Sequence, residues 1–153
     1  MGLDDDIAFF SQVPIFAALD REALRILAIG AETRQLQSGA VLFYAGELAD
    51  GGYLIQDGLL RLEPGSFGET KEIIVGPGTL VGELALLTDM VCQATAIAKE
   101  PVTVIRISRS LFRKMLEGYP AAALTLRDIM AKRLDAWQRE LGNVKKKMEK
   151  GGK

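Results

Sequence analysis

The sequence predicts a mainly β protein with helices at both ends, whose strands form a sandwich, a roll or a barrel. From about residue 32 to 107 the chain consists of short apolar runs interrupted by glycines, which is typical of many short strands joined by turns. The segments on either side space their apolar residues as helices do. With 153 residues, of which 48% are hydrophobic and 25% charged, the chain suits one globular domain.

Two helices are expected before residue 32. The first carries a short apolar cluster, and Asp20 can cap the second because an aspartate side chain accepts hydrogen bonds from the free amides of a first helical turn. Gly30 then ends this second helix. The apolar positions are Ile7, Phe9 and Phe10 in the first segment, and Leu24, Ile26 and Leu27 in the second.

Five apolar runs in the central part of the chain are the expected strands. They lie at residues 40–44, 53–55, 59–62, 73–75 and 102–107. Glycines fall at or near the joints between them, where a positive φ or a close approach of two backbones is needed. These are Gly39, Gly46, Gly51, Gly52, Gly58, Gly65, Gly68, Gly76, Gly78 and Gly82.

The helical pattern returns after residue 107. Ser108 or Ser110 can cap a helix that Gly118 and Pro120 stop, and a last helix is expected over about residues 121–147. Two rows of apolar residues in this last helix repeat every seven positions, as in a coiled-coil seam, and predict a homodimer. The alternative is that the helix packs this stripe on its own β body. The rows are Met130, Trp137 and Val144, and Leu134, Leu141 and Met148.

The composition argues against catalysis, secretion and membrane insertion. The chain has no histidine and no recognisable nucleophile and base pair, so we expect no enzyme activity, metal or cofactor. Its one cysteine, Cys92, excludes an internal disulfide and fits a reducing compartment. The apolar stretches are too short to cross a bilayer and the N-terminus is acidic, so a cytoplasmic protein is expected.

Nucleic acid is not an expected partner of this chain. The net charge is −1, and although Lys145 to Lys153 includes five lysines, basic tails of this kind are more often solubilising. A DNA-binding helix-turn-helix would have to follow the last helix, and no recognition helix can be identified.

The stretch with the most distinctive chemistry is residues 76–87, Gly-Pro-Gly-Thr-Leu-Val-Gly-Glu-Leu-Ala-Leu-Leu. Gly82 permits a close backbone approach, and Glu83 opens a short helical turn, expected to extend to Leu87, whose free amides would form an anion-binding arrangement. The carboxylate of Glu83 can accept hydrogen bonds from a pair of sugar hydroxyls. From the residues alone, the favoured explanation of the segment is an ordinary joint between a strand and a helix that begins with an acidic residue.

Residues 78–87 closely resemble the phosphate-binding cassette of the cyclic-nucleotide-binding family, which includes catabolite-activator-type regulators, kinase regulatory subunits and gated channels. Other segments are similar to the strand-and-turn framework of that family and to the helix before its terminal hinge helix. They are Gly39, residues 46–50, residues 53–61 and residues 110–120.

The resemblance implies a β-roll, that is, a double-stranded β-helix or cupin-like jelly roll, with N-terminal helices and a long C-terminal helix. The roll and its N-terminal helices would span residues 1–120. Residues 121–153 would form a dimerisation or lid helix and a basic tail.

The resemblance also assigns the ligand site. The glutamate that matches Glu83 binds the ribose 2′-hydroxyl, and backbone amides around Gly82, Leu84 and Ala85 meet the cyclic phosphate. The family's phosphate-binding arginine falls at Cys92 if Ala94 is aligned with its Arg-x-Ala-Thr ending, or at Gln93 if the alignment slips by one residue. Neither residue supplies a cation, and the nearest basic residues in sequence are Lys71 and Lys99.

Two functions are compatible with this pattern. The first is a sensor or regulatory domain for a cyclic nucleotide or another small anionic ligand, with atypical or weak binding because the arginine is replaced. The second is a degenerate fold that serves as a ligand-independent dimerisation or interaction module. Other candidate roles are weaker: Cys92 is expected to be an inert core residue, Trp137 a seam residue more than a purine-stacking one, and Arg61 and Arg106 are expected to face solvent or pair with carboxylates.

Overall fold

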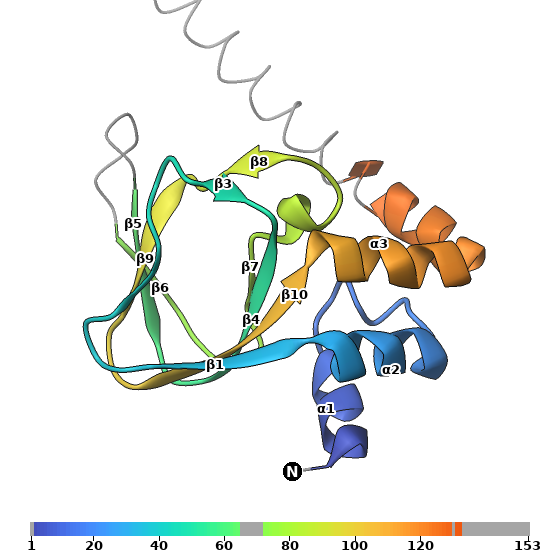
Figure 1. Cartoon of the computed structure of the whole chain (residues 1–153), viewed down its shortest axis with the longest axis horizontal. Helices are drawn as coiled ribbons and strands as arrows, with labels where there is room; N and C mark the ends of the chain where they lie inside the picture. The colour runs from blue at the N-terminus through green and yellow to red at the C-terminus, as the bar shows by residue number, and fades with distance from the viewer. Residues whose placement is uncertain (1, 65–71, 130, 133–153) are drawn as a thin grey trace, which may run out of the picture.

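Figure 1 shows the computed structural model of the chain, which describes residues 2–64, 72–129, 131 and 132. The chain begins with two helices, α1 (Leu3–Phe10) and α2 (Arg21–Gly30). The side chain of Asp20 accepts a hydrogen bond of 2.9 Å from the amide of Ala23, so the predicted cap of α2 is confirmed.

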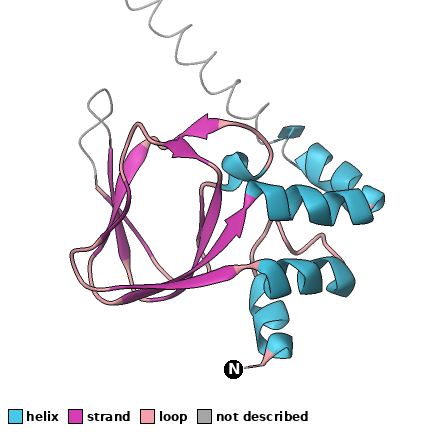
Figure 2. Cartoon of the chain, in the orientation of Figure 1, coloured by secondary structure: helices cyan, strands magenta, loops and turns pink. Residues whose placement is uncertain are grey.

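The β body consists of two four-stranded antiparallel sheets and a two-stranded one. The strand orders are β1-β10-β4-β7, β2-β9-β5-β6 and β3-β8. Figures 1 and 2 show the two larger sheets facing each other across the roll, with the helices gathered beside β10 and β4. The predicted mainly β roll with N-terminal helices is therefore confirmed. The strands are β1 (Glu32–Leu36), β2 (Val41–Phe43), β3 (Leu48–Ala49), β4 (Gly51–Asp57), β5 (Leu60–Pro64), β6 (Ile73–Val75), β7 (Leu80–Val81), β8 (Met90–Val91), β9 (Ala94–Ala98) and β10 (Val102–Ser108).

Strand β10 separates two buried clusters because successive side chains of a strand point to opposite faces. Ile105 and Ile107 pack with the helices in the larger cluster. Val102 and Val104 pack with side chains from other strands in the smaller cluster, in the interior of the roll. The even-numbered face of β10 therefore faces the roll interior.

Helix α3 (Arg109–Gly118) follows β10 directly. The hydroxyl of Ser108 accepts a hydrogen bond of 3.1 Å from the amide of Leu111, which confirms this serine as the cap. Residues 120–129 are again helical, and Leu126 among them is fully buried in the larger cluster. The proposed seam residues Met130, Leu134, Trp137, Leu141 and Val144 lie outside the described residues, so the dimer seam and the domain boundary at residue 120 stay predictions.

Two glycines let the backbone segments around the predicted cassette approach each other closely. A Cβ atom on Gly51 would lie 2.2 Å from the carbonyl oxygen of Ile107, closer than two such atoms can come. Gly82 has a φ of +83°, which favours glycine, and a Cβ atom there would lie 3.3 Å from the carbonyl oxygen of Gly51. The start of β4 therefore fits tightly between β10 and the turn that carries Glu83.

Candidate ligand-binding site

The predicted cassette forms a strand, a glycine turn and one turn of 3₁₀ helix. Strand β7 ends at Val81, Gly82 makes the turn, and η1 (Glu83–Leu86) follows. The short helical turn predicted to start at Glu83 is therefore confirmed. The amide of Ala85 donates a hydrogen bond of 3.1 Å to the carbonyl oxygen of Gly82. Ala85 is one of the residues whose amides were expected to contact an anion, and its amide already has this partner within the turn.

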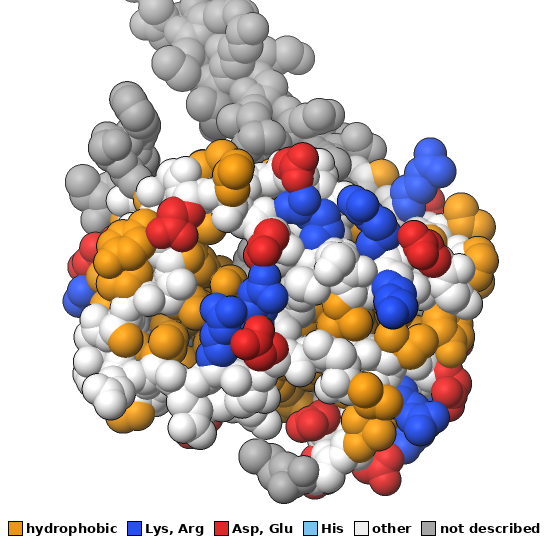
Figure 3. All heavy atoms as spheres, in the orientation of Figure 1, with side chains coloured by type: hydrophobic (Ala, Val, Ile, Leu, Met, Phe, Trp, Pro, Cys, Tyr) orange, Lys and Arg blue, Asp and Glu red, His pale blue; other side chains and the backbone are white. Residues whose placement is uncertain are grey.

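A cavity of about 760 Å³ opens between the two large sheets, next to η1. Its volume is in the range of small-molecule sites. Figure 3 shows the hollow, with hydrophobic side chains on one side and a group of basic and acidic side chains on the other. The lining residues are Arg34, Leu42, Phe43, Glu47, Leu48, Ala49, Asp50, Gly51, Tyr53, Leu62, Val81, Gly82, Glu83, Ala85, Met90, Val91, Cys92, Gln93, Ala94 and Arg106.

The cavity brings together most of the site residues that the sequence suggested, from two separate segments of the chain. The exception is Leu84, whose side chain is outside the described set. The roles of these residues in binding stay predictions. Those on the cavity wall are Gly82, Glu83, Ala85, Cys92, Gln93 and Ala94.

The apolar wall belongs to the sheet that holds β2 and β5. Leu42 and Phe43 come from β2, and Leu62 comes from β5. The ring of Phe43 lies 5.7 Å, centroid to centroid, from that of Tyr53 on the opposite sheet. Tyr53 also packs against the smaller buried cluster in the interior of the roll. This wall suits an apolar or aromatic group.

The backbone of Cys92 is held by the turn before β3. Its amide donates a hydrogen bond of 2.8 Å to the carbonyl oxygen of Glu47, and its own carbonyl oxygen accepts one of 2.8 Å from the amide of Gly46. Burial raises the pKa of the Cys92 thiol, and the negative charges of Glu47 and Asp50 raise it further. The thiol is therefore neutral near pH 7, and its surroundings are acidic.

This raised pKa predicts slow alkylation of Cys92. Because the thiolate is the reacting form, iodoacetamide at pH 7.5 should modify the protein several times more slowly than it modifies free glutathione. Asp50→Asn and Glu47→Gln should each speed the reaction, since each removes a negative charge that disfavours the thiolate. The chain has one cysteine, so mass spectrometry of the intact protein gives the rate directly. Glu117→Gln, an exposed change in α3, is the control, and equal rates for all variants would contradict the electrostatic assignment.

Gln93 is the other candidate for the position of the missing arginine. Its side chain is exposed, and its amide nitrogen donates a hydrogen bond of 3.0 Å to the carbonyl oxygen of Val91. The site therefore has neutral side chains at both alignments of the cassette ending.

The structure places arginines on the cavity wall that the sequence analysis did not assign to the site. Arg106 was expected to face solvent or pair with carboxylates; it does pair with Asp50, but its side chain is only 18% exposed and lines the cavity. Arg34, on β1, lines it as well. The alternation along β10 is the signal that points to Arg106, because it shares its face with the buried Val102 and Val104.

Neighbouring groups stabilise the positive charge of Arg106. Burial lowers the pKa of its guanidinium, but hydrogen bonds and charge interactions with Asp50 and Tyr53 outweigh this effect and leave the pKa above its ordinary value. Both carboxylate oxygens of Asp50 lie 2.8 Å from one nitrogen, Nη2, of Arg106. The carboxylate of Glu32, directly opposite Arg106 in the β1–β10 pairing, lies 3.9 Å from Nη1.

Comparison with known proteins is consistent with this geometry. A family model described as "Cyclic nucleotide-binding domain" matches residues 33–119. The HTH-type transcriptional regulator Cmr of Mycobacterium tuberculosis is 30% identical over 80% of this chain and 50% of its own length. The Cyclic AMP receptor protein of Thermus thermophilus is 29% identical over 79% of this chain and 57% of its own. The chain therefore spans about half the length of these curated relatives.

A solved structure shows the same fold. The cyclic nucleotide-binding-like protein from Brucella abortus is 42% identical, with a TM-score of 0.67, and the match covers 74% of this chain and 99% of that one. A second one, the N-terminal domain of a transcriptional regulator from Streptomyces coelicolor, is 27% identical with a TM-score of 0.77, covering 87% of this chain and 94% of that one.

Proposed function

Because the chain belongs to the cyclic nucleotide-binding domain family, we propose that it is a regulatory module that binds a cyclic nucleotide or a related small anionic ligand between its two sheets. The observation that carries this proposal is the position of Glu83, at the start of a 3₁₀ turn and on the wall of a cavity of about 760 Å³. A carboxylate there can accept hydrogen bonds from the ribose hydroxyls. The name of the Thermus relative points to cyclic AMP as the first ligand to test.

We expect binding to be weak. A desolvated arginine on a phosphate is a charge-assisted pair, and its loss commonly costs about 2–5 kcal/mol, which corresponds to roughly 30-fold to several-thousand-fold in affinity. Cys92 and Gln93 provide no such pair, and Glu47 and Asp50 add negative charge near the same point. A ligand that bound at micromolar concentration in the presence of the arginine would then bind toward the millimolar range.

A titration tests this proposal. Cyclic AMP and cyclic GMP, added up to millimolar concentration, should raise the unfolding temperature because a ligand that binds only the folded state stabilises it. Glu83→Gln should reduce the shift severalfold, since it removes the charged acceptor for the ribose hydroxyls. Glu22→Gln, an exposed change in α2, should leave the shift as in the wild type. Calorimetry with the same ligands gives the dissociation constants.

The missing cation also favours a second function, a ligand-independent interaction module. In that case no nucleotide changes the unfolding temperature of the wild type or of the Glu83 variant. The protein is then a dimer without ligand, and replacing Leu134 and Leu141 with asparagine makes it a monomer in analytical ultracentrifugation. A thermal shift that depends on Glu83 would exclude this alternative.

A further inference from the structure

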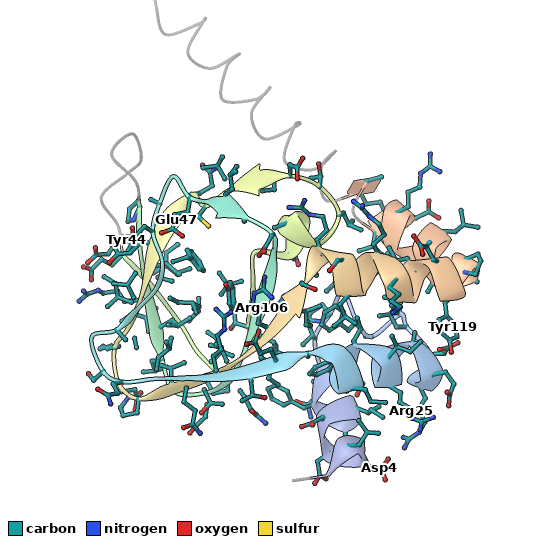
Figure 4. All side chains as sticks on the ribbon, in the orientation of Figure 1. Asp4, Arg25, Tyr44, Glu47, Arg106 and Tyr119 are labelled. Atoms are coloured by element: carbon teal, nitrogen blue, oxygen red, sulfur yellow. The ribbon has the colours of Figure 1, made fainter. Side chains whose placement is uncertain are left out.

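Arg106 places a permanent positive charge inside the cavity. It follows Val102 and Val104 on the face of β10 that points into the roll, but it lies where the cavity opens and not in the packed interior. Figure 4 shows its side chain reaching into the space between the two sheets. Because a guanidinium cannot lose its proton in a protein, this charge is present at every working pH.

The carboxylate of Asp50 holds this guanidinium in a way that is easy to replace. Both oxygens of Asp50 contact the same nitrogen of Arg106, at 2.8 Å, so the pair does not use the two-nitrogen fork that arginine offers to phosphates and carboxylates. The Asp50 side chain is 74% exposed. Ion pairs with so exposed a partner add little stability, and an anion that engages two nitrogens competes well with them.

Asp50 also lies close to the point where the family's phosphate contact is expected. Its charge acts on the Cys92 thiol as well as on Arg106. The carboxylate thus lies within electrostatic reach of both the cassette ending and the cation on β10. Among the described residues that line the cavity, Arg34 is the other cation, but its side chain is 42% exposed and its Nη2 lies 3.5 Å from Glu32.

We propose that Arg106 takes over the task of the missing cassette arginine: it neutralises the anionic group of the ligand, and this group replaces the carboxylate of Asp50. The inference rests on the proposed function for the identity of the ligand. The ligand class is a small molecule with one phosphate or carboxylate group and an aromatic or apolar body. That body would lie against Leu42 and Phe43.

The test uses the full chain, with cyclic AMP in calorimetry and inorganic phosphate alone in thermal unfolding. Arg106→Gln should weaken cyclic AMP binding about tenfold, and Asp50→Asn should strengthen it about threefold because the competing carboxylate is removed. In the double variant the gain from Asp50→Asn should disappear, since Asp50 acts through Arg106. Arg61→Gln is the matched control: this arginine also lies on a strand and pairs with carboxylates, but it does not line the cavity.

Each pattern of results separates this inference from the proposed function. If cyclic AMP binds and Arg106→Gln changes its affinity no more than Arg61→Gln does, the assignment of Arg106 is wrong and the function survives. If cyclic AMP fails to bind any variant but phosphate raises the unfolding temperature of Asp50→Asn and not of the double variant, Arg106 is the anion site and the nucleotide proposal is wrong. No response to either probe overturns both. Arg106→Lys is a second variant for the case in which Arg106→Gln does not fold. It keeps the positive charge and should therefore keep part of the affinity for cyclic AMP.

Discussion

We expect the substitution Cys92→Arg to strengthen cyclic AMP binding by about tenfold or more, because it restores a cation at the position that the cassette ending assigns to the phosphate. Cys92 lines the cavity, and hydrogen bonds with Gly46 and Glu47 hold its backbone on both sides. The nearby negative charges of Glu47 and Asp50, which disfavour a thiolate at this position, favour a guanidinium. They also compete for it, so the gain should stay near the lower end of the range for an arginine and phosphate pair.

Two companion variants show whether charge and shape are both needed. Cys92→Met adds volume without charge, so the affinity for cyclic AMP should either stay the same or fall. Cys92→Lys adds a point charge without the planar fork and should gain less than the arginine. Calorimetry with cyclic AMP and with adenosine, which lacks the phosphate, completes the comparison: the arginine should improve only the nucleotide. An equal gain for adenosine would show that the new side chain acts by packing.

The helical caps and the apolar strands could be predicted because their signals are local. Asp20 and Ser108 cap the helices that follow them, and the apolar run at 102–107 matches β10 to within a residue. The strand β1, with the sequence Glu-Thr-Arg-Gln-Leu, has no apolar pattern. It is an edge strand with mostly exposed side chains, and its pairing with β10 forms it. Pairing of this kind leaves no local trace in the sequence.

Strand β9 was missed for a different reason. Its sequence, Ala-Thr-Ala-Ile-Ala, is rich in alanine, which has a low preference for strands. The small side chains fit because β9 lies between β2 and β5, and Ala96 and Ala98 are fully buried there. Close packing selects small residues at these points, and that requirement depends on neighbours distant in the sequence.

The candidate site also contains residues that a local sequence signal identifies and residues that only strand pairing brings together. Glu83 and its turn follow from one contiguous stretch of glycines and apolar residues, so the sequence alone could locate them. Arg106 and Asp50 are 56 positions apart and meet only because β10 pairs with β4, whose first residue follows Asp50. The register of that pairing decides which cation enters the cavity. The sequence of β10 alone shows which of its side chains share a face, but it does not show that Asp50 lies beside Arg106.

Arg109 is the residue at which the walls of the cavity join the helical layer. It is the first residue of α3, where a cation is disfavoured because the amides at a helix N-terminus carry partial positive charge. Its guanidinium compensates by donating to the carbonyl oxygens of Ala85, at 2.8 Å, and Ala49, at 2.6 Å, and to the carboxylate of Asp89. One side chain thus ties η1, β3 and the segment before β8 to the start of α3.

The substitution Arg109→Ala should therefore lower the free energy of unfolding by about 2–4 kcal/mol, since it leaves two carbonyl groups without a charged donor in a place that is largely closed to water. The Arg109 side chain is only 17% exposed. Arg113→Ala, one turn further along α3 and exposed, should change the stability by less than about 0.5 kcal/mol. Urea unfolding followed by circular dichroism measures both.

The same substitution bears on ligand binding, because Ala85 and Ala49 both line the cavity. Loss of the Arg109 contacts should let η1 and β3 move independently, so the thermal shift caused by cyclic AMP should fall together with the stability. Arg109→Lys should recover only part of either quantity, since an ammonium group cannot reach three acceptors that lie on different elements with the planar geometry of a guanidinium. If Arg109→Ala is as stable as Arg113→Ala, the side chain of Arg109 is not needed at this junction. The backbone hydrogen bond of 2.6 Å from the amide of residue 109 to the carbonyl oxygen of Asp50 then holds it.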